Sequence, residues 1–242
     1  MERWDIDEKR RIMKELEQFD TPTITNAVAT YSENKETCLG LFHPFAINWY
    51  TDQNLKCLYP ELGARCANVV TVTYTQKDAV YNRLEFLDLL NAIEEAPKPV
   101  ILAMVQCGED QIKHKNALIG GNMLTAFKQL GVTGVLGDGP ARDIKEMRPL
   151  DVQCLFSGVA AGHGSSLIAA INTPVSISGM DVCPGEIIHM DQNGAVKFPE
   201  KYLEQVLEKA KLISSMDQKR QEAMNETKDP EELASLMKAV YV

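Results

Sequence analysis

The sequence lacks the features of a membrane-spanning, secreted or nucleic-acid-binding protein. No apolar run approaches the ~20 residues that a membrane span needs, so we expect no membrane partner. The first residues, MERWDIDEKRR, are charged with no apolar stretch behind them, which is not typical of a secretory signal. Acidic residues outnumber basic ones by 34 to 25, and the net charge is −9. Because nucleic-acid binding requires clustered Lys and Arg, we expect no nucleic-acid partner.

Several sequence motifs of metal, disulfide and nucleotide chemistry are also missing. The six cysteines form no CxxC pair, and none lies near a His at zinc-finger spacing. We therefore expect reduced thiols in a cytoplasmic protein, with Cys66 and Cys154 as small core residues and a catalytic cysteine as an open alternative. The four histidines form neither HxH nor HExxH, and GVLGDGP lacks the Walker spacing of a nucleotide-binding loop.

The apolar pattern predicts one α/β domain. The chain has 242 residues, 45% of them hydrophobic, with no repeats and no low-complexity linker. Strands are expected at 66–74, 99–105, 132–137, 152–158 and 174–179, with a hairpin over 185–199. Helices are expected at 84–96 and 120–131, the first with Leu84, Leu87, Leu90 and Ile93 inward.

Helical segments are also predicted at both ends of this core. Residues 7–19 favour a helix, and a second short helix is expected around Ile24, Ala27, Val28 and Tyr31, with Thr21 or Thr23 as its cap. Further helices are expected after Pro199 and from Asp229. The charged stretch 217–228 is interpreted as a link. We thus divide the chain into a helical extension (1–20), a catalytic domain (20–213) and a second helical extension (214–242).

A charged cluster follows an expected buried strand near the middle of the chain. The stretch GVLGDGPARDIKEM, residues 134–147, passes through a predicted Gly-Asp-Gly-Pro turn into Arg142, Asp143 and Glu146. If residues 143–146 form a helical turn, their i,i+3 spacing puts both carboxylates on one side.

Chain geometry places this cluster beside the start of the preceding helix. A helix from Gly121 to Leu130 is ~15 Å long, and a returning strand over 132–136 covers ~16 Å. The chain goes out on the helix and comes back on a strand of matching length. Arg142 and Asp143 should therefore lie near Gly120 and Gly121.

This arrangement suits a 2-oxo acid and a divalent cation. A helix start attracts a carboxylate, and paired glycines leave no side chain in the way. Arginine binds a carboxylate through two hydrogen bonds, while Asp and Glu oxygens suit Mg²⁺ or Mn²⁺. The alternative is that Gly-Gly only starts a helix and Arg-Asp-x-x-Glu is a solvated surface turn. The pattern alone leaves both interpretations open.

Several blocks of the sequence resemble one known family. They are TPTITNAV, NALIGGNMLTAFKQLGVTGVLGDGPARD and VCPGEIIHMDQNGAVKFP, in the family's order. Gly-Gly, then twenty residues, then Arg-Asp-x-x-Glu is similar to the signature of the class II pyruvate aldolases that cleave 4-hydroxy-4-methyl-2-oxoglutarate. The same superfamily contains proteins similar to regulator of ribonuclease activity A (RraA-like). The resemblance covers about residues 20–213.

The resemblance implies a fold, an assembly and roles for the charged residues. The fold would be a swivelling β/β/α domain, here with added N- and C-terminal helices, and the assembly a homotrimer or hexamer with sites near subunit interfaces. Arg142 and Asp143 would be catalytic, with Asp143 ligating Mg²⁺ or Mn²⁺ and Glu146 supporting it through water. The implied substrate-binding residues are Gly120, Gly121, Asn122, Met123 and Arg142.

The resulting expectation is a metal-dependent carbon–carbon lyase acting on a 2-oxo acid. It would cleave a 4-hydroxy-2-oxo acid, decarboxylate oxaloacetate, or both, through a pyruvate enolate that the metal stabilises. One alternative is a non-catalytic regulatory binding protein of the ribonuclease-regulator type. Another is an enzyme of the same fold acting on an unrelated carbonyl compound.

Two features depart from the family pattern. Gly121 stands where the characterised aldolases carry an acidic residue, which puts long aldol substrates in doubt. The segment GVAAGHGSSL and the region 33–62 also differ, and we expect them to set specificity.

Other candidate residues are weighed against simpler roles. His163 is a candidate substrate contact, His114 is expected at the surface, and His189 is expected to be structural. Lys113 and Lys115 lie in a segment too polar for a Schiff-base lysine. We expect Asp138 to fix the turn that aims Arg142.

Overall fold

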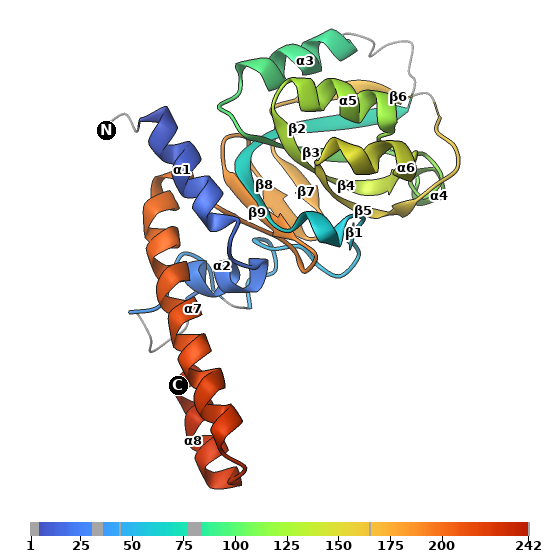
Figure 1. Cartoon of the computed structure of the whole chain (residues 1–242). Helices are drawn as coiled ribbons and strands as arrows, with labels where there is room; N and C mark the ends of the chain where they lie inside the picture. The colour runs from blue at the N-terminus through green and yellow to red at the C-terminus, as the bar shows by residue number, and fades with distance from the viewer. Residues whose placement is uncertain (1–4, 31–35, 44, 77–83, 165, 242) are drawn as a thin grey trace.

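The computed structural model describes residues 5–30, 36–43, 45–76, 84–164 and 166–241 (Figure 1). Its centre is an eight-stranded sheet with the order β1-β5-β4-β3-β2-β9-β10, in which β6 also pairs with β2. The strands are β1 (Lys56–Cys57), β2 (Arg65–Gln76), β3 (Val100–Gln106), β4 (Val132–Ala141), β5 (Gln153–Val159), β6 (Ser166–Ile171), β9 (Ile187–Asp191) and β10 (Gly194–Phe198). The strands β2, β3, β4 and β5 are parallel, whereas β1, β6, β9 and β10 join antiparallel.

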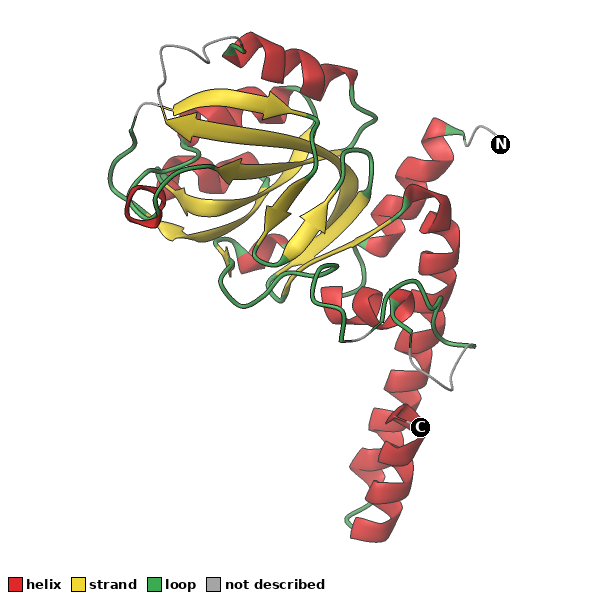
Figure 2. Cartoon of the chain, turned by 180° about the vertical axis from the view of Figure 1, so that it is seen from behind, coloured by secondary structure: helices red, strands yellow, loops and turns green. Residues whose placement is uncertain are grey.

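The long strand β2 has two partners on the same edge. Residues 65–68 pair with β9, and residues 72–76 pair with β6. The segment before β1 follows β10, with Thr51 N–H donating to Ala195 O at 2.9 Å. The sheet therefore curls until it is nearly closed as a barrel (Figure 2).

Helices cover one face of the sheet and a small hairpin covers the other. The helices α3 (Phe86–Glu95), α5 (Gly121–Gln129) and α6 (Ile144–Met147) lie over one face (Figure 1). Their buried side chains, including Leu89, Leu124 and Phe127, share a core with β2, β3 and β4. The opposite face packs on the hairpin β7 (Val175–Ile177) and β8 (Met180–Val182). The short α4 (Asp110–Lys113) precedes α5.

The remaining helices form a layer beside the barrel. The helices α1 (Ile6–Leu16), α2 (Thr21–Val28) and α7 (Leu203–Glu226) share a third core with β10. The last helix, α8 (Pro230–Tyr241), lies against the end of α7 that projects from the body (Figures 1 and 2). None of the described helices is both long enough and apolar enough to cross a membrane.

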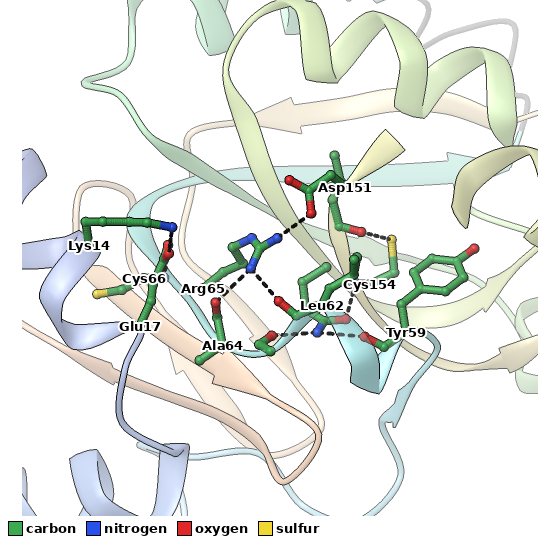
Figure 3. A network of polar contacts seen from close by, with 12 residues as sticks. Lys14, Glu17, Tyr59, Leu62, Ala64, Arg65, Cys66, Asp151 and Cys154 are labelled. Atoms are coloured by element: carbon green, nitrogen blue, oxygen red, sulfur yellow. Dashed lines mark hydrogen bonds and ion pairs between the residues drawn. The ribbon is translucent and has the colours of Figure 1, made fainter. Parts of the chain in front are cut away.

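An ion-pair network ties the amino end of the sheet together (Figure 3). The guanidinium of Arg65 donates to Leu62 O at 2.7 Å and to Asp151 Oδ1 at 2.8 Å. At the next residue, the N–H of Cys66 donates to the Glu17 carboxylate, which also pairs with Lys14. The start of β2 is thus fixed both to the loop before β5 and to the segment that follows α1.

The sequence-based element predictions are largely confirmed, with corrections where packing outweighs local pattern. Of the residues expected to point inward on the third helix, Ile93 is buried and Leu84 and Leu90 pack against the core. Leu87 is instead 61% exposed, and Leu89 is buried in its place. The cap of α2 is Asp20, whose carboxylate accepts from Thr23 N–H, and not Thr21 or Thr23. Strands β6 and β8 had no prediction, because each is short and lacks a distinct apolar alternation. Tyr31, expected in the second helix, lies outside the described residues.

The charged stretch 217–228 is not a link over most of its length. Helix α7 continues through it to Glu226, and it also runs without a break across residues 213 and 214. Residues 217–226 consist mostly of good helix formers, joined by Asp217–Arg220 and Gln218–Glu222 contacts along the helix. High charge is therefore accommodated here on a solvated helix.

The Gly-Asp-Gly-Pro segment is not a turn. Strand β4 continues through it to Ala141, with a register shift against β5 between Gly137 and Pro140. Glycine is needed at position 139, because a Cβ there would stand 2.5 Å from Gln106 Nε2. The Asp138 carboxylate accepts a hydrogen bond from the N–H of Gln106, on the neighbouring strand β3, at 2.9 Å. Arg142 is therefore positioned by the end of a bulged strand and not by a turn.

Candidate functional site

A cavity of about 620 Å³ lies at the carboxyl ends of β2 and β4. Parallel strands end on a common edge, which is where open α/β sheets usually bind ligands. Tyr74 comes from the end of β2, and Arg142 and Asp143 directly follow β4. The cavity is lined by Tyr74, Leu84, Glu85, Phe86, Ala117, Leu118, Ile119, Gly120, Asn122, Met123, Arg142, Asp143, His163, Gly164, Ser166, Leu167 and Ile168.

The start of α5 and the end of β4 are held together by backbone bonds. Arg142 N–H donates to Ile119 O at 3.0 Å, and Ile119 forms a bridge with Ala141. The Asp143 carboxylate accepts from Gly121 N–H at 3.2 Å. The proximity predicted from helix and strand lengths is therefore confirmed.

The paired glycines leave space in which two carboxylates pack. A Cβ on Gly120 would stand 2.5 Å from Asp143 Oδ2 and 3.1 Å from Arg142 Nε. A Cβ on Gly121 would stand 2.6 Å from Glu146 Oε2. Glycine at position 121 thus leaves space that the Glu146 side chain occupies.

Arg142 and Asp143 form a half-exposed ion pair in the cavity. Arg142 Nε lies 3.4 Å from Asp143 Oδ2, and the two side chains are 35% and 31% exposed. Asp143 adopts the left-handed conformation, with φ 58° and ψ 40°. Non-glycine residues rarely take this conformation, and such strain gathers at functional sites. The pair is accessible to a ligand and is held in place by backbone geometry.

The first turn of α5 supplies backbone donors beside this pair. The N–H groups of Asn122 and Met123 have no partner within the helix, because the first turn of any helix lacks one. Gly120, Asn122 and Met123 line the cavity, whereas Gly121 is buried behind them with its N–H bonded to Asp143. Three of the four predicted substrate-binding residues of this helix start thus reach the cavity.

The carboxylates can hold a hydrated Mg²⁺ ion but not a fully protein-ligated metal. No group of three or more His, Cys, Asp or Glu residues suited to a metal occurs among the described residues. Mg²⁺ usually takes one or two carboxylates and completes its shell with water and substrate oxygens. Asp143, in the cavity, has the chemistry for such a ligand. Glu146 is exposed and outside the lining, so its contribution would pass through water.

The structure places the candidate histidines and lysines in different environments, which can be compared with their expected roles. His163 is exposed on the cavity wall, as its candidate role requires. His114 is exposed, and His189 is fully buried, donating from Nε2 to Leu16 O at 3.1 Å. Lys113 faces Asp138 at 3.7 Å. The surface role of His114 and the structural role of His189 are confirmed.

Sequence analysis missed the residues that hold the far side of the cavity. Asn116 is 7% exposed, and its amide donates to Gln106 Oε1 at 3.0 Å and to Ser166 Oγ at 2.9 Å. It also accepts from Gly164 N–H, beside His163. This network attaches Gly164 and the start of β6 to Gln106 at the end of β3. Asn116 and Gln106 lie more than forty residues before the residues they hold. Local sequence patterns therefore could not predict these contacts.

Tyr74 was also missed, and its hydroxyl is unusual. The side chain is 6% exposed, and its hydroxyl has no hydrogen-bond partner among the described residues. Burial raises the pKa of Tyr74 well above its ordinary value, so the hydroxyl stays protonated at physiological pH. The residue lies in a β-branched run that predicted only a buried strand.

Comparisons with known proteins agree on the family. Over 112 residues, the chain is 33% identical to a putative 4-hydroxy-4-methyl-2-oxoglutarate aldolase of Halalkalibacterium halodurans, covering 46% of this chain and 53% of that protein. It is 31% identical to an uncharacterised protein of Methanocaldococcus jannaschii, covering 61% and 70%. A Thermus thermophilus 4-hydroxy-4-methyl-2-oxoglutarate aldolase is 26% identical, covering 36% and 53%. The match thus spans about half the length of the relatives named as aldolases.

Solved structures share the fold over most of the chain. A Pseudomonas syringae protein of uncharacterised function matches with a TM-score of 0.70 at 19% identity, covering 93% of each chain. A Streptomyces coelicolor protein, described as an unusual member of the RNase ES inhibitor RraA family, matches with a TM-score of 0.63 at 17% identity, covering 94% of this chain and all of that one. The family model described as RraA-like, Aldolase/RraA, matches residues 21–197. The chain therefore belongs to the RraA-like family, and its fold is that family's α/β fold.

Proposed function

We propose that this protein is a divalent-metal-dependent carbon–carbon lyase that acts on a 2-oxo acid. The carrying observation is that one cavity gathers Arg142, Asp143 and the start of α5. A guanidinium and unpaired helix N–H groups bind a carboxylate, and the carboxylate of Asp143 suits a hard cation. The names of two relatives as 4-hydroxy-4-methyl-2-oxoglutarate aldolases support the same chemistry.

In this mechanism the α5 start and Arg142 orient the substrate. The N–H groups of Asn122 and Met123 bind the substrate carboxylate, and the Arg142 guanidinium bonds to the carboxylate and the keto oxygen. As the C3–C4 bond of the 2-oxo acid breaks, negative charge develops on the keto oxygen at C2. The fixed guanidinium of Arg142 stabilises that charge. Asp143, with support from Glu146 through water, would hold Mg²⁺ or Mn²⁺, which supplies Lewis-acid stabilisation at the same oxygen.

No lysine is among the described residues that line the cavity, which argues against a Schiff-base route. Lys113 faces the Asp138 carboxylate, and Lys115 is exposed. The reaction would instead proceed by charge stabilisation and proton transfer. His163, on the cavity wall, is the candidate for that proton transfer.

The test is pyruvate release from oxaloacetate and from 4-hydroxy-4-methyl-2-oxoglutarate, with Mg²⁺ and with excess chelator. The metal-only background is subtracted. Protein-dependent release that chelator abolishes is expected, and Arg142→Ala and Asp143→Ala should each lower kcat/KM on the order of 10²-fold or more. Full activity in both variants would overturn the site.

The regulatory alternative predicts a different outcome. A non-catalytic binder of the ribonuclease-regulator type would release no pyruvate from either substrate and would bind a basic partner through its acidic surface. Loss of pyruvate release on chelation, restored by Mg²⁺, has no explanation in that alternative. The homotrimer that we expect is tested separately by light scattering.

A further inference from the structure

The cavity is polar at one end and apolar at the other. The polar end is the α5 start with Arg142 and Asp143. The more apolar end comes from Leu84 and Phe86, which flank Glu85, and from β6, where Leu84 forms a bridge with Ile168. Phe86, the first residue of α3, is held there by a ring contact with Phe127 at 5.7 Å.

The positive charge of the described cavity lining lies at the polar end. Among the described residues that line the cavity, Arg142 is the one Lys or Arg, and Glu85 and Asp143 are acidic. A second carboxylate on a substrate would therefore meet apolar side chains and Glu85. Burying a charge without a partner is costly, so this cavity disfavours a dicarboxylate.

The volume allows more than a pyruvate unit. About 620 Å³ falls within the ~300–1,000 Å³ of pockets that enclose drug-sized ligands. The side chains available to a substrate tail are Leu84, Phe86, Leu118, Met123, Leu167 and Ile168. Burying an apolar group against them gains ~25 cal/mol per Å² of area removed from water.

We propose that the preferred substrate is a 4-hydroxy-2-oxo acid with a single carboxylate and an apolar, aryl-sized group on C4. This inference rests on the proposed function and names the substrate class of that site. The carboxylate and keto oxygen bind at Arg142 and the α5 start. The C4 substituent lies against Phe86 and β6, where the dicarboxylate 4-hydroxy-4-methyl-2-oxoglutarate would place a second charge.

The cleavage balances without an added oxidant or reductant. The C4 hydroxyl loses its proton and becomes the carbonyl of an aldehyde. The C3–C4 bond breaks, and its electron pair forms the enolate of pyruvate. C3 then takes a proton from solvent, so the products are pyruvate and an apolar aldehyde.

The test compares 4-hydroxy-2-oxo-4-phenylbutanoate with 4-hydroxy-4-methyl-2-oxoglutarate. Pyruvate release is measured with Mg²⁺, and benzaldehyde is measured by its absorbance as a second product. The wild-type protein is expected to show at least a ten-fold higher kcat/KM for the phenyl substrate. Equal values, or a preference for the dicarboxylate, would overturn the inference.

A matched pair of variants tests the position of the apolar end. Phe86→Arg puts a cation where the inference places the phenyl group, on a side chain that is already 40% exposed. It should lower kcat/KM for the phenyl substrate about ten-fold and raise it for the dicarboxylate. Leu87→Arg, at the neighbouring residue, lies outside the cavity lining and should change neither. Equal effects of Phe86→Arg on both substrates would contradict the assignment.

The outcomes separate this inference from the proposed function. If the dicarboxylate or oxaloacetate releases pyruvate and the phenyl substrate does not, the lyase function holds and the apolar specificity fails. If no substrate releases pyruvate in any metal condition, both fail. Phenyl-substrate cleavage that Phe86→Arg selectively weakens supports both.

Discussion

The carboxylate of Asp143 accepts a hydrogen bond from the backbone N–H of Gly121 at 3.2 Å, across the gap between the end of β4 and the start of α5. This contact joins the only two parts of the site that sequence spacing had paired. A Cβ on Gly120 would stand 2.5 Å from Asp143 Oδ2, and a Cβ on Gly121 would stand 2.6 Å from Glu146 Oε2, so a side chain at either position would displace a carboxylate.

Gly120→Ala should disable the site without unfolding the protein. The Gly120 backbone is extended, at φ −144°, so alanine is tolerated there conformationally. Its Cβ would nevertheless force Asp143 Oδ2 and Arg142 Nε to move. We expect kcat/KM for the 2-oxo acid to fall on the order of 10²-fold with little change in Tm.

Ser176→Ala is the control for that variant. Ser176 is exposed on strand β7 and lies outside the cavity lining. Its kinetics should resemble the wild type. A Gly120→Ala protein that retains full activity would show that the Arg142–Asp143 arrangement is not needed.

Asp143→Asn should abolish stabilisation by a divalent cation. A ligand that binds only the folded protein raises its stability, so Mg²⁺ should raise the Tm of the wild type. Removing the charge of Asp143 should remove that rise, while Asp181→Asn, at the exposed position of strand β8, should keep it. Differential scanning calorimetry across a Mg²⁺ titration measures both. An undiminished rise in Asp143→Asn would place the cation elsewhere.

Tyr74→Phe should stabilise the protein. The hydroxyl is buried with no partner among the described residues, and an unsatisfied buried polar group costs ~1–3 kcal/mol. Removing it should raise the free energy of unfolding by ~1 kcal/mol in urea titrations.

Tyr59→Phe is the comparison for Tyr74→Phe. Tyr59 is also buried, but its hydroxyl donates to Ile144 O at 2.9 Å. This variant should lower the free energy of unfolding by ~1 kcal/mol. If Tyr74→Phe is destabilising as well, the Tyr74 hydroxyl has a partner in solution.

Acid should destabilise the fold through His189. Burial lowers the pKa of His189 from 6.5 to about 4, although Asp191 nearby opposes the shift. Between these values the unfolded chain binds a proton that the folded protein does not, so the free energy of unfolding falls as the pH falls from about 6.5 to about 4. The loss attributable to this group is at most on the order of 3 kcal/mol.

The neutral ring explains the direction of that effect. Nε2 donates to Leu16 O, and Nδ1 lies 3.0 Å from Thr21 Oγ1, so Thr21 is the donor there. Urea unfolding at several pH values should show a shallower pH slope in His189→Gln than in the wild type. Identical slopes would assign the acid sensitivity to other groups.

Local sequence patterns were sufficient to predict most helices and strands. They also predicted that Arg142 and Asp143 lie beside the start of α5. The β-branched run of β2, the apolar run of β3 and the hairpin of β9 and β10 are specified by their own residues. The Gly-Gly to Arg-Asp spacing placed two charges at a helix start, because helix rise and strand rise are fixed by backbone geometry. Those features depend on neighbours along the chain.

Contacts between distant segments decided the rest. The bulged passage of β4 through 137–140 depends on the packing of Gly139 against Gln106, and the far wall of the cavity depends on Asn116 holding Ser166. The apolar end exists because Leu84 and Ile168, far apart in sequence, meet across a bridge. Sequence periodicity reports which side of an element is buried, but not which element buries it. The sequence by itself therefore determined the strands, the helices and the charged helix start, and only the tertiary structure decided the shape and polarity of the cavity.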